Sequence, residues 1–471
     1  MIIDLYNTRC RVHGNLVEIG WLNSYLAFDD QSTAYRRGRD GRAKRVKPQK
    51  IRLFDFTDES FPTGLLALVY QKVREMGWTI TFNDCRRPCP LPIATDLSWL
   101  RSYQREAVDA AIKKGRGILH EPTGAGKSEI AAGIIKSFPV YWTFIVHRSG
   151  LMYQTAERFR EREIPGVGIL GDGKSEIGDR VTVTTFQTMW AQKHTSEVKS
   201  LFVKSQGLLV DESHVLPGPT LSQVAAAFDE ARYRFGLSGT PLDRSDQRSL
   251  ITIGAIGPII HRTRANVLID AGVLAKPDIR MVRVEQAIER PTYTGVYGEG
   301  VIRSTKRNSA IISCVKNATK PCLVFVTNLK HGNILLNTVK STGMSAFFVQ
   351  GNVDELKRQE LKDKLRNKQI DVVIASVVWQ EGIDIPELSS VVIAGGGRSV
   401  IAALQRVGRG MRRAAGKDTF EVWDIADVGN RILERHSKAR IAAYSREGYD
   451  VRHVSFGVSA QRIGSDENST T

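Results

Sequence analysis

One short stretch, residues 117–128, constrains the fold of this 471-residue chain more than any other part of the sequence. It reads GILHEPTGAGKS: four residues typical of a buried strand, a loop with two glycines, and the start of a helix with apolar residues at helical spacing. In such a unit the loop N–H groups and the helix N-terminus favour a negatively charged phosphate. The alternative is an ordinary glycine turn, but the flanking strand and helix favour the phosphate site.

Specific residues of this loop are expected to contact phosphate and metal. Lys127 is placed to reach the terminal phosphates, and the hydroxyl of Ser128 is placed to bind Mg²⁺. Glu121 stands where the full G-x-x-x-x-G-K-S pattern has its first glycine, so the match is incomplete. The predicted phosphate-loop residues are Pro122, Thr123, Gly124, Ala125, Gly126, Lys127 and Ser128.

Short apolar segments alternate with helical stretches along most of the chain. They lie at residues 117–120, 143–146, 181–185, 207–210 and 235–237, and again at 323–326, 345–349, 371–375 and 390–394. This alternation predicts parallel, doubly wound sheets, so the expected fold class is α/β with two tandem parallel-sheet domains. Ligands bind at the carboxyl ends of strands in such sheets, and polar clusters follow several of these segments.

Two carboxylates follow the strand expected at residues 207–210. Asp211 can hold the Mg²⁺ of a nucleotide, and Glu212 can orient and deprotonate an attacking water. An isolated Asp-Glu pair is more often a solvated turn, but the apolar strand and the upstream phosphate loop favour catalysis. Gln104 is a candidate base contact, because a glutamine amide can read both the donor and the acceptor on an adenine edge.

The second half lacks a phosphate loop but contains an arginine cluster at residues 406–413. A guanidinium always carries charge and binds phosphate bidentately, so this cluster could complete a nucleotide site. The alternative is a basic helix face on nucleic acid, and the two interpretations can hold for different arginines.

The formal net charge of +17 indicates a polyanionic partner, with nucleic acid ahead of an anionic membrane. A merely basic solvated surface is the alternative. Five scattered cysteines argue against a disulfide framework and fit a reducing compartment. The sequence contains no signal-peptide core and no apolar run long enough to span a bilayer, so we expect a cytoplasmic protein.

Residues 1–97 are predicted to form a separate small α+β domain that binds nucleic acid. Strands are expected at 17–22 and 51–56, and an amphipathic helix at 63–77. A basic loop between the strands is interpreted as a flexible arm along phosphates, with a solvated loop as the alternative. Its basic residues include Arg36, Arg37, Arg39, Arg42, Lys44 and Arg45.

From about residue 100 to residue 427, the order and spacing of these motifs resemble the superfamily 2 helicases. PTGAGKS resembles motif I, the DESH sequence at 211–214 resembles the DEAH box, and SGTP at 238–241 resembles motif III. By this resemblance Tyr103 and Gln104 contact adenine, while Arg409 and Arg412 act as arginine fingers on the γ-phosphate. The resemblance also assigns nucleotide-site roles to Gly382, Asp384 and Gln405, coupling roles to His214, Ser238 and Thr240, and nucleic-acid contacts to His147, Arg148, Thr185 and Gln187.

The resemblance implies two RecA-like domains, at residues 98–275 and 276–455, preceded by the N-terminal domain and followed by a disordered polar tail at 456–471. ATP and Mg²⁺ are the implied cofactors. The segments at 51–55, 61–65, 235–239 and 422–427 are similar to the UvsW-type phage helicases. That group remodels branched DNA, so the expected partners are forks, Holliday junctions and D-loops, in the host cytoplasm if a phage encodes the chain.

Four other functions stay open on these residues. An RNA helicase is the first, because the motifs do not separate DNA from RNA. A translocase that moves on duplex DNA without separating strands is the second. A non-catalytic scaffold with a decayed ATPase, and the motor subunit of a restriction nuclease, are the third and fourth.

Overall fold

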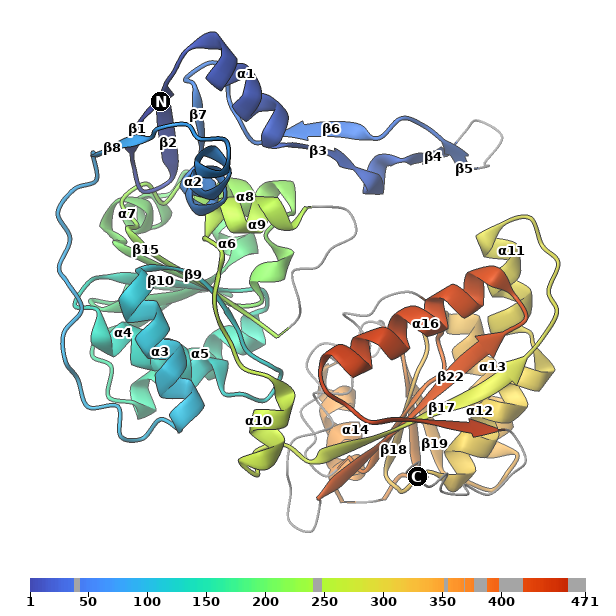
Figure 1. Cartoon of the computed structure of the whole chain (residues 1–471). Coiled ribbons are helices and arrows are strands. Elements are labelled where there is room, and N and C mark those ends of the chain that lie inside the picture. Colours follow the sequence, from blue (N-terminus) through green and yellow to red (C-terminus); the bar gives the residue numbers. More distant parts are fainter. Residues whose placement is uncertain are drawn as a thin grey trace, which may run out of the picture. The chain divides into compact units, whose positions relative to one another are not determined.

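The computed structural model describes residues 1–37, 43–239, 248–350, 355–367, 369–376, 388–397 and 418–455. The chain divides into two compact units, Met1–Thr263 and Arg264–Thr471. Each unit contains a large, mainly parallel sheet covered by helices, and small sheets precede the first one (Figure 1). The predicted α/β class with two tandem parallel-sheet domains is therefore confirmed. The predicted four-part division of the chain stays a prediction.

The large sheet of the first unit has the strand order β12-β11-β13-β10-β14-β15-β9-β16. All neighbouring pairs are parallel except β11 with β12. The strands are β9 Arg116–His120, β10 Trp142–Val146, β11 Val167–Gly171, β12 Lys174–Glu176, β13 Val181–Thr185, β14 Gly207–Val210, β15 Tyr233–Ser238 and β16 Ile259–Arg262. The helices are α3 Ser102–Lys114, α4 Lys127–Ser137, α5 Ser149–Glu161, α6 Phe186–Ala191, α7 Ser196–Lys204, α8 Pro219–Ala226 and α9 Ser249–Ala255, with the 3-10 turn η3 Ser213–Val215.

Both faces of this sheet are buried, because neighbouring residues of one strand enter different cores. Leu119 and Phe144 pack in the cluster that includes α4 and α5, while Ile118 and Ile145 pack in the cluster that includes α7 and α8. A strand buried on both faces reads as an unbroken apolar run, which is why most of these strands were predictable. The sequence did not predict β11, which contains two glycines, or β16, a short edge strand that is only partly buried.

The large sheet of the second unit has the order β19-β20-β18-β21-β22-β17-β23, with all pairs parallel. The strands are β17 Lys276–Glu285, β18 Cys322–Phe325, β19 Ala346–Val349, β20 Val372–Ala375, β21 Ser390–Ile393, β22 Thr419–Val428 and β23 Val451–Ser455. The helices are α10 Ala265–Asp270, α11 Tyr293–Tyr297, α12 Thr305–Asn317, α13 Leu329–Lys340, α14 Glu355–Arg366 and α16 Arg431–Arg446, with the π-turn η4 Gly298–Ile302. In the described part of the chain, no helix is long and apolar enough to cross a membrane.

The longest strands of the second sheet, β17 and β22, were not expected from the sequence. They pair along ten residues each. Their apolar pattern is interrupted by charged residues, among them Asp424 and Asp427, whose side chains are nevertheless buried. Asp424 forms an ion pair with the buried Arg440, and Asp427 forms one with the buried Arg307. The charges that made β22 difficult to predict as a buried strand are therefore neutralised inside the fold.

The N-terminal region forms a four-stranded sheet in the order β7-β2-β1-β8. Its strands are β1 Ile2–Leu5, β2 Arg9–His13, β7 Ser60–Pro62 and β8 Thr81–Asp84, and its helical elements are α1 Leu16–Tyr25, η2 Thr63–Leu65 and α2 Leu66–Glu75. Two further antiparallel strand pairs follow α1. They are β3 Ala27–Asp30 with β6 Gln49–Arg52 and β4 Tyr35–Arg37 with β5 Ala43–Arg45, and η1 Gln31–Thr33 connects β3 to β4. Figure 1 shows that these pairs form an extended N-terminal arm leading away from the small sheet.

The strand predicted at residues 17–22 was wrong, since these residues lie in α1. Asn15 caps this helix: its Oδ1 accepts hydrogen bonds from the Val17 and Glu18 N–H groups at 3.0 Å, and the Glu18 carboxylate accepts the Asn15 N–H at 2.9 Å. An Asn followed three residues later by Glu is typical of a helix start, and here it favours a helix although the residues that follow are mostly apolar. The strand expected at 51–56 is also shorter than predicted, because β6 ends at Arg52.

The small N-terminal sheet and η2 pack against α9 of the same unit, next to Leu250 and Ile253, and contact the loop that precedes β15. Asn7 Nδ2 donates to the Asp229 carbonyl at 2.9 Å, and Thr8 Oγ1 donates to the Asp229 carboxylate at 2.6 Å. The buried carboxylate of Asp30, at the end of β3, accepts a 2.6 Å bond from Arg248 Nη2. The root of the N-terminal arm is therefore fixed to the same unit that contains the phosphate loop.

A buried histidine in the second unit predicts a pH dependence of stability. Burial, and then the neighbouring Arg307 guanidinium, lower the pKa of His331 to about 3, and its Nε2 lies 2.9 Å from Asn308 Oδ1. The unfolded chain binds a proton at His331 below pH ~6.5. The folded chain does not, so it loses stability as the pH falls from 6.5 towards 3.

We expect this histidine to contribute a loss of about 2 kcal/mol between pH 6.5 and pH 5, at roughly 1.4 kcal/mol per pH unit. Guanidinium-induced unfolding at both pH values measures it. His331→Gln, which keeps an N–H donor towards Asn308, should lose stability less steeply by that amount. An identical pH dependence in the two proteins would show that His331 is protonated in the folded chain.

Candidate active site

The phosphate loop lies between β9 and α4, as the sequence predicted. Gly126 is the N-cap of α4 and has a φ of +79°, a conformation that L side chains rarely adopt. A Cβ at this position would also lie 2.5 Å from Gln104 Nε2. Glycine is therefore required here both by the backbone and by a neighbouring side chain. Lys127 and Ser128 are the first two residues of α4, so both lie in its first turn, directly after the phosphate loop.

Tyr103 and Gln104, at the start of α3, bind the phosphate loop through the carbonyl of Ala125. The Tyr103 hydroxyl donates to the Ala125 carbonyl at 3.0 Å, and Gln104 Nε2 donates to the same oxygen at 2.9 Å. The Gln104 Oε1 accepts the Arg101 N–H at 3.0 Å. Both ends of the Gln104 amide are thus bonded to backbone, and the observed role of this pair is to brace the loop. Their predicted contact with adenine stays a prediction.

Asp211 and Glu212 follow β14 directly and lie at the same sheet edge as the phosphate loop. The Lys127 ammonium is 3.0 Å from Glu212 Oε1, although the two residues are 85 positions apart in the sequence. Glu212 adopts a left-handed backbone with φ of +48°, and its N–H donates to the Asp211 carboxylate at 2.9 Å. The sharp turn after β14 points the Glu212 side chain at Lys127, so the structure brings together the predicted lysine and the predicted general base.

The two neighbouring carboxylates have opposite pKa shifts. Burial raises the pKa of Asp211, and the adjacent Glu212 carboxylate raises it further. Burial would also raise the pKa of Glu212, but the charges and hydrogen bonds of Lys127 and His214 outweigh it and lower that pKa well below its ordinary value. Lys127 and His214 therefore stabilise the ionised form of Glu212 in this arrangement.

His214 links the carboxylate to the next strand. Its Nδ1 lies 3.3 Å from Glu212 Oε2 and 3.3 Å from the Ser238 hydroxyl at the end of β15. Ser213, which replaces the alanine of the family pattern, is fully buried, and a Cβ at Gly236 would lie 2.7 Å from its own Cβ. The residue before His214 must therefore be small. The predicted coupling residues His214 and Ser238 are in contact, whereas Thr240 lies outside the described residues.

Glu121, which stands where the phosphate-loop pattern has its first glycine, lies directly after β9. Its side chain is fully buried, and Oε1 lies 2.8 Å from Nδ1 of His261 on β16. The Glu121 N–H also donates to the Ser238 carbonyl at 2.8 Å. His261 could not have been found from the sequence, because no spacing rule connects two residues 140 positions apart.

The residues predicted to contact nucleic acid occupy the ends of two other strands. His147 and Arg148 follow β10, and Thr185 ends β13. Gln187 Nε2 donates to the His147 carbonyl at 3.3 Å, so the two predicted contact motifs meet at one edge of the sheet. Thr185 also caps α6 by accepting the Thr188 N–H at 3.1 Å, which gives it a structural role of its own.

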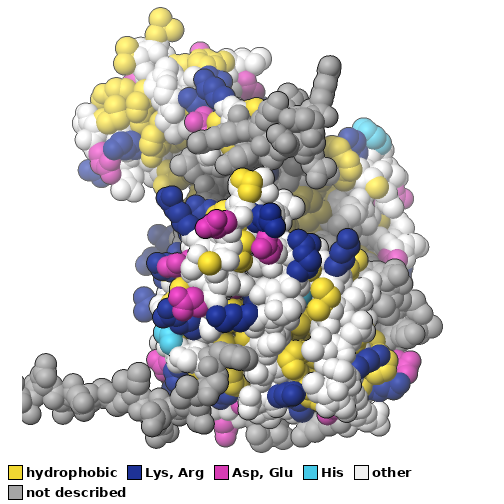
Figure 2. Space-filling view, turned by 90° about the vertical axis from the view of Figure 1, so that its right-hand side faces the viewer, with side chains coloured by type: hydrophobic (Ala, Val, Ile, Leu, Met, Phe, Trp, Pro, Cys, Tyr) yellow, Lys and Arg dark blue, Asp and Glu magenta, His cyan; other side chains and the backbone are white. Residues whose placement is uncertain are grey.

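The predicted basic arm is described in part. Arg36 and Arg37 belong to β4, and Lys44 and Arg45 belong to β5, so the basic stretch is a β-hairpin rather than an irregular loop. Figure 2 shows lysine and arginine side chains spread over the face in view, with acidic side chains among them. On that face the positive excess is not gathered into one patch. The predicted residues outside the described part of the chain are Arg39, Arg42, Gly382, Asp384, Gln405, Arg409 and Arg412.

Comparisons with known proteins agree with this arrangement. Residues 98–243 match the family "Type III restriction enzyme, res subunit", and residues 306–414 match the family "Helicase conserved C-terminal domain". The chain is 28% identical over 384 residues to the ATP-dependent DNA helicase uvsW of Enterobacteria phage T4, covering 74% of this chain and 75% of the phage protein.

Two further similarities extend the comparison. The chain is 28% identical over 365 residues to the DNA 3'-5' translocase XPB2 of Sulfurisphaera tokodaii, covering 69% of this chain and 81% of that protein. The solved structure of Dbp5 from S. cerevisiae, bound to RNA and ADP BeF3, has the same fold over 75% of this chain and 89% of that one, with a TM-score of 0.52 and 15% identity. The two family matches span the phosphate loop and the Asp211-Glu212 pair in one half and the arginine cluster in the other, and the chain belongs to the superfamily 2 helicases, which are ATP-dependent enzymes.

Proposed function

We propose that this helicase acts on DNA and remodels branched structures, namely replication forks, Holliday junctions and D-loops, in the cytoplasm. The main support for ATP hydrolysis at this site is the 3.0 Å contact between Lys127 Nζ and Glu212 Oε1. It brings the lysine of the phosphate loop next to the carboxylates that follow β14. The two relatives, named as a DNA helicase and a DNA translocase, support DNA as the substrate. The similarity of the N-terminal segments to UvsW-type helicases supports branched DNA.

In this proposal Lys127 and Glu212 act as an exchanging pair. When ATP binds, the Lys127 ammonium is drawn towards the terminal phosphate, which carries more negative charge than one carboxylate, and its contact with Glu212 Oε1 is weakened. His214 remains beside Oε2 and keeps the carboxylate oriented. Glu212 then positions the attacking water and accepts its proton, while the loop N–H groups and Lys127 hold the phosphates.

The residues around this pair fit Mg²⁺. The Ser128 hydroxyl and the Asp211 carboxylate are hard oxygen ligands, which Mg²⁺ prefers, and in nucleotide sites it takes its other ligands from phosphates and water. Accordingly, the described residues contain no group of three His, Cys, Asp or Glu side chains that would hold a metal on its own. When bound, Mg²⁺ neutralises charge that develops on the phosphate oxygens.

The second parallel-sheet domain is proposed to contribute Arg409 and Arg412 as arginine fingers, with Gly382, Asp384 and Gln405 at the nucleotide. This assignment is supported by the match of residues 306–414 to the helicase C-terminal family. Hydrolysis is then coupled to movement along the DNA backbone. The contacts with DNA are proposed to be mainly to phosphates, because a motor has to move independently of sequence.

A duplex translocase is the second candidate, and the similarity to a protein named a DNA translocase favours it. The two functions share the ATPase site and differ in what movement accomplishes. RNA is a further possible substrate, because the motor motifs do not distinguish it from DNA.

The first prediction concerns the nucleic acid that stimulates ATP hydrolysis. The steady-state ATPase rate should be highest with a model fork or a four-way junction, lower with linear duplex or single-stranded DNA, and lowest with RNA. Lys127→Ala and Arg409→Ala should each abolish the stimulated rate. Equal stimulation by linear duplex would favour the plain translocase, and a preference for RNA would overturn the DNA assignment.

The second prediction separates catalysis from nucleotide binding. Glu212→Gln should lower the ATPase kcat by at least about a hundredfold, because a general base contributes on the order of 10² to 10⁴ in rate. Titration with a fluorescent ATP analogue should show retained binding in Glu212→Gln and weakened binding in Lys127→Ala.

Glu163→Gln is the matched control for this experiment. Glu163 is an exposed glutamate that also has a left-handed backbone, with φ of +56°, but it lies at the end of α5. Its variant should keep the normal rate. A comparable loss of kcat in both variants would mean that backbone strain, and not the base, explains the effect.

The third prediction concerns salt. If the N-terminal arm lies along phosphates, replacing Lys44 and Arg45 together by alanine should weaken DNA binding. It should also make the slope of log K against log salt shallower by about 1.4 to 1.8, since each lost phosphate contact removes roughly 0.7 to 0.9. The pair Lys72→Ala and Arg74→Ala on α2 controls for the lost charge alone, and an equal change in its slope would exclude a specific role for the arm.

A further inference from the structure

A glycine turn after β21 accepts hydrogen bonds from four side chains at three of its backbone carbonyls. Arg307 Nη1 donates to the Ala394 carbonyl at 2.6 Å, and Arg440 Nη1 donates to the Gly397 carbonyl at 2.7 Å. The Tyr297 hydroxyl donates to the Gly395 carbonyl at 2.6 Å, and the Thr327 hydroxyl lies 3.3 Å from the same oxygen. We call these four donors the carbonyl clamp: Tyr297, Arg307, Thr327 and Arg440.

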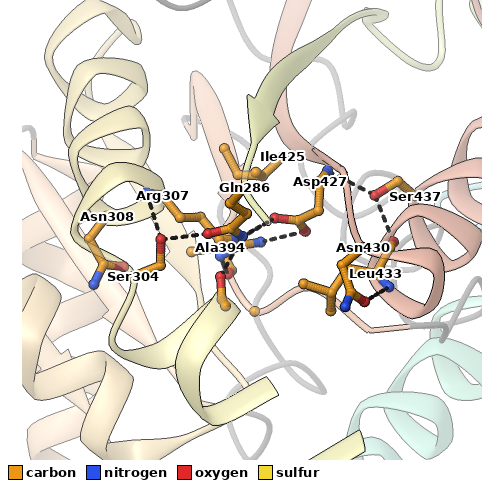
Figure 3. A network of polar contacts seen from close by, with 12 residues as sticks. Gln286, Ser304, Arg307, Asn308, Ala394, Ile425, Asp427, Asn430, Leu433 and Ser437 are labelled. Atoms are coloured by element: carbon orange, nitrogen blue, oxygen red, sulfur yellow. Dashed lines mark hydrogen bonds and ion pairs between the residues drawn. The ribbon is translucent and has the colours of Figure 1, made fainter. Parts of the chain in front are cut away.

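The two arginines of the carbonyl clamp are themselves fixed by carboxylates of β22. Arg307 Nε donates to Asp427 Oδ1 at 2.8 Å, and both side chains are almost fully buried. Figure 3 shows Arg307 between Asp427 and Ala394, with Gln286 bonded to the same carboxylate. Arg440 Nε likewise donates to Asp424 Oδ2 at 2.9 Å. Each guanidinium therefore connects a buried carboxylate on β22 to a carbonyl of the turn.

The charge of Arg440 is maintained despite its burial. Burial lowers the pKa of Arg440, but the Asp424 carboxylate, which also accepts the Tyr444 hydroxyl at 3.0 Å, more than offsets this and raises it. A charged guanidinium is planar and donates in fixed directions. The turn is accordingly fixed in position and in orientation.

The backbone of the turn leaves few alternatives. Gly396 and Gly397 have φ values of +59° and +90°, which favour glycine. A Cβ at Gly395 would lie 3.0 Å from the Thr327 N atom, so even alanine would press the turn away from β18 and its following residues. The sequence AGGG at 394–397 therefore fits one path, and the carbonyl clamp selects it.

The position of this turn in the chain suggests why it is fixed so firmly. Gly397 leads directly into residues 398–417, which contain Arg409 and Arg412. Buried ion pairs are weak contributors to stability, because well-packed apolar residues in their place are often as stable or more so. Two buried ion pairs whose arginines bond the same turn are better explained by their effect on geometry, since they fix the direction of the backbone at residues 394–397.

We propose that the carbonyl clamp is a positioning device for the arginine-finger segment: Tyr297, Arg307, Thr327 and Arg440 fix where and in which direction the chain enters it. In this proposal they are positioning residues, because they act through the chain that leads to Arg409 and Arg412. The inference rests on the proposed arginine-finger role. It adds residues that no helicase motif of the sequence analysis contains.

The test uses a variant that removes one donor and keeps the packing. Tyr297→Phe in the full-length chain removes a hydroxyl that contacts both the Gly395 carbonyl and the Thr327 hydroxyl. It should lower the DNA-stimulated ATPase kcat by at least about three- to tenfold, the loss expected from one hydrogen bond. The KM for ATP and the unfolding midpoint should stay within twofold and about 2 °C of the parent. Thr327→Val should give the same pattern. Tyr293→Phe is the matched control, because Tyr293 lies on the same short helix with its ring 5.8 Å from that of Tyr297, and it should leave kcat unchanged.

A double-mutant cycle separates the clamp from general effects. In an Arg409→Lys background, Tyr297→Phe should cause little further loss of kcat, because both changes act on the same element. Full additivity, or an unchanged kcat in Tyr297→Phe alone, would overturn the clamp. If Arg409→Ala itself leaves ATP hydrolysis intact, the proposed arginine-finger role fails instead, so the two failures are distinguishable.

Discussion

The contact between Lys127 and Glu212 is the interaction on which the proposed ATPase site of the first unit depends. A lysine and a carboxylate meet there because two parallel strands, β9 and β14, end at the same edge of one sheet with β15 between them. The phosphate loop turns back from β9 into α4, and the left-handed Glu212 turns the chain after β14 towards it. Because both faces of the sheet are buried, the ends of β9 and β14 are held in fixed positions. The Lys127 ammonium and the Glu212 carboxylate are therefore held next to each other, and both are largely buried.

The second unit uses buried charge differently. Asp424 and Asp427 lie on the interior strand β22, and each is neutralised by one arginine from a covering helix, Arg440 from α16 and Arg307 from α12. Such pairs contribute little net stability, but they orient the guanidinium groups towards the turn at 394–397. The first unit thus places a charged pair at a sheet edge, where we propose catalysis, whereas the second buries charged pairs in its core, where their guanidinium groups also bond the turn at 394–397.

Much of this arrangement could be predicted from the sequence, for a physical reason. Strands buried on both faces, such as β10 and β14, are unbroken apolar runs, and the phosphate loop has a fixed strand–loop–helix context. The failures also have causes. The capping box of Asn15 and Glu18 converted an expected strand into α1, and the buried aspartates of β22 concealed an interior strand. The Glu121–His261 pair and the donors to the 394–397 turn join residues far apart in sequence, so no local pattern could reveal them.

Real-time branch migration tests the central claim most directly. A four-way junction with a fluorophore and a quencher on two arms reports migration as a change in emission, with the parent chain, Lys127→Ala and Glu212→Gln compared at equal concentration. The account predicts ATP-dependent conversion of the junction by the parent chain and none by either variant. Rapid ATP hydrolysis by the parent chain on this junction, with the junction left intact, would contradict the proposal that the helicase remodels branched DNA.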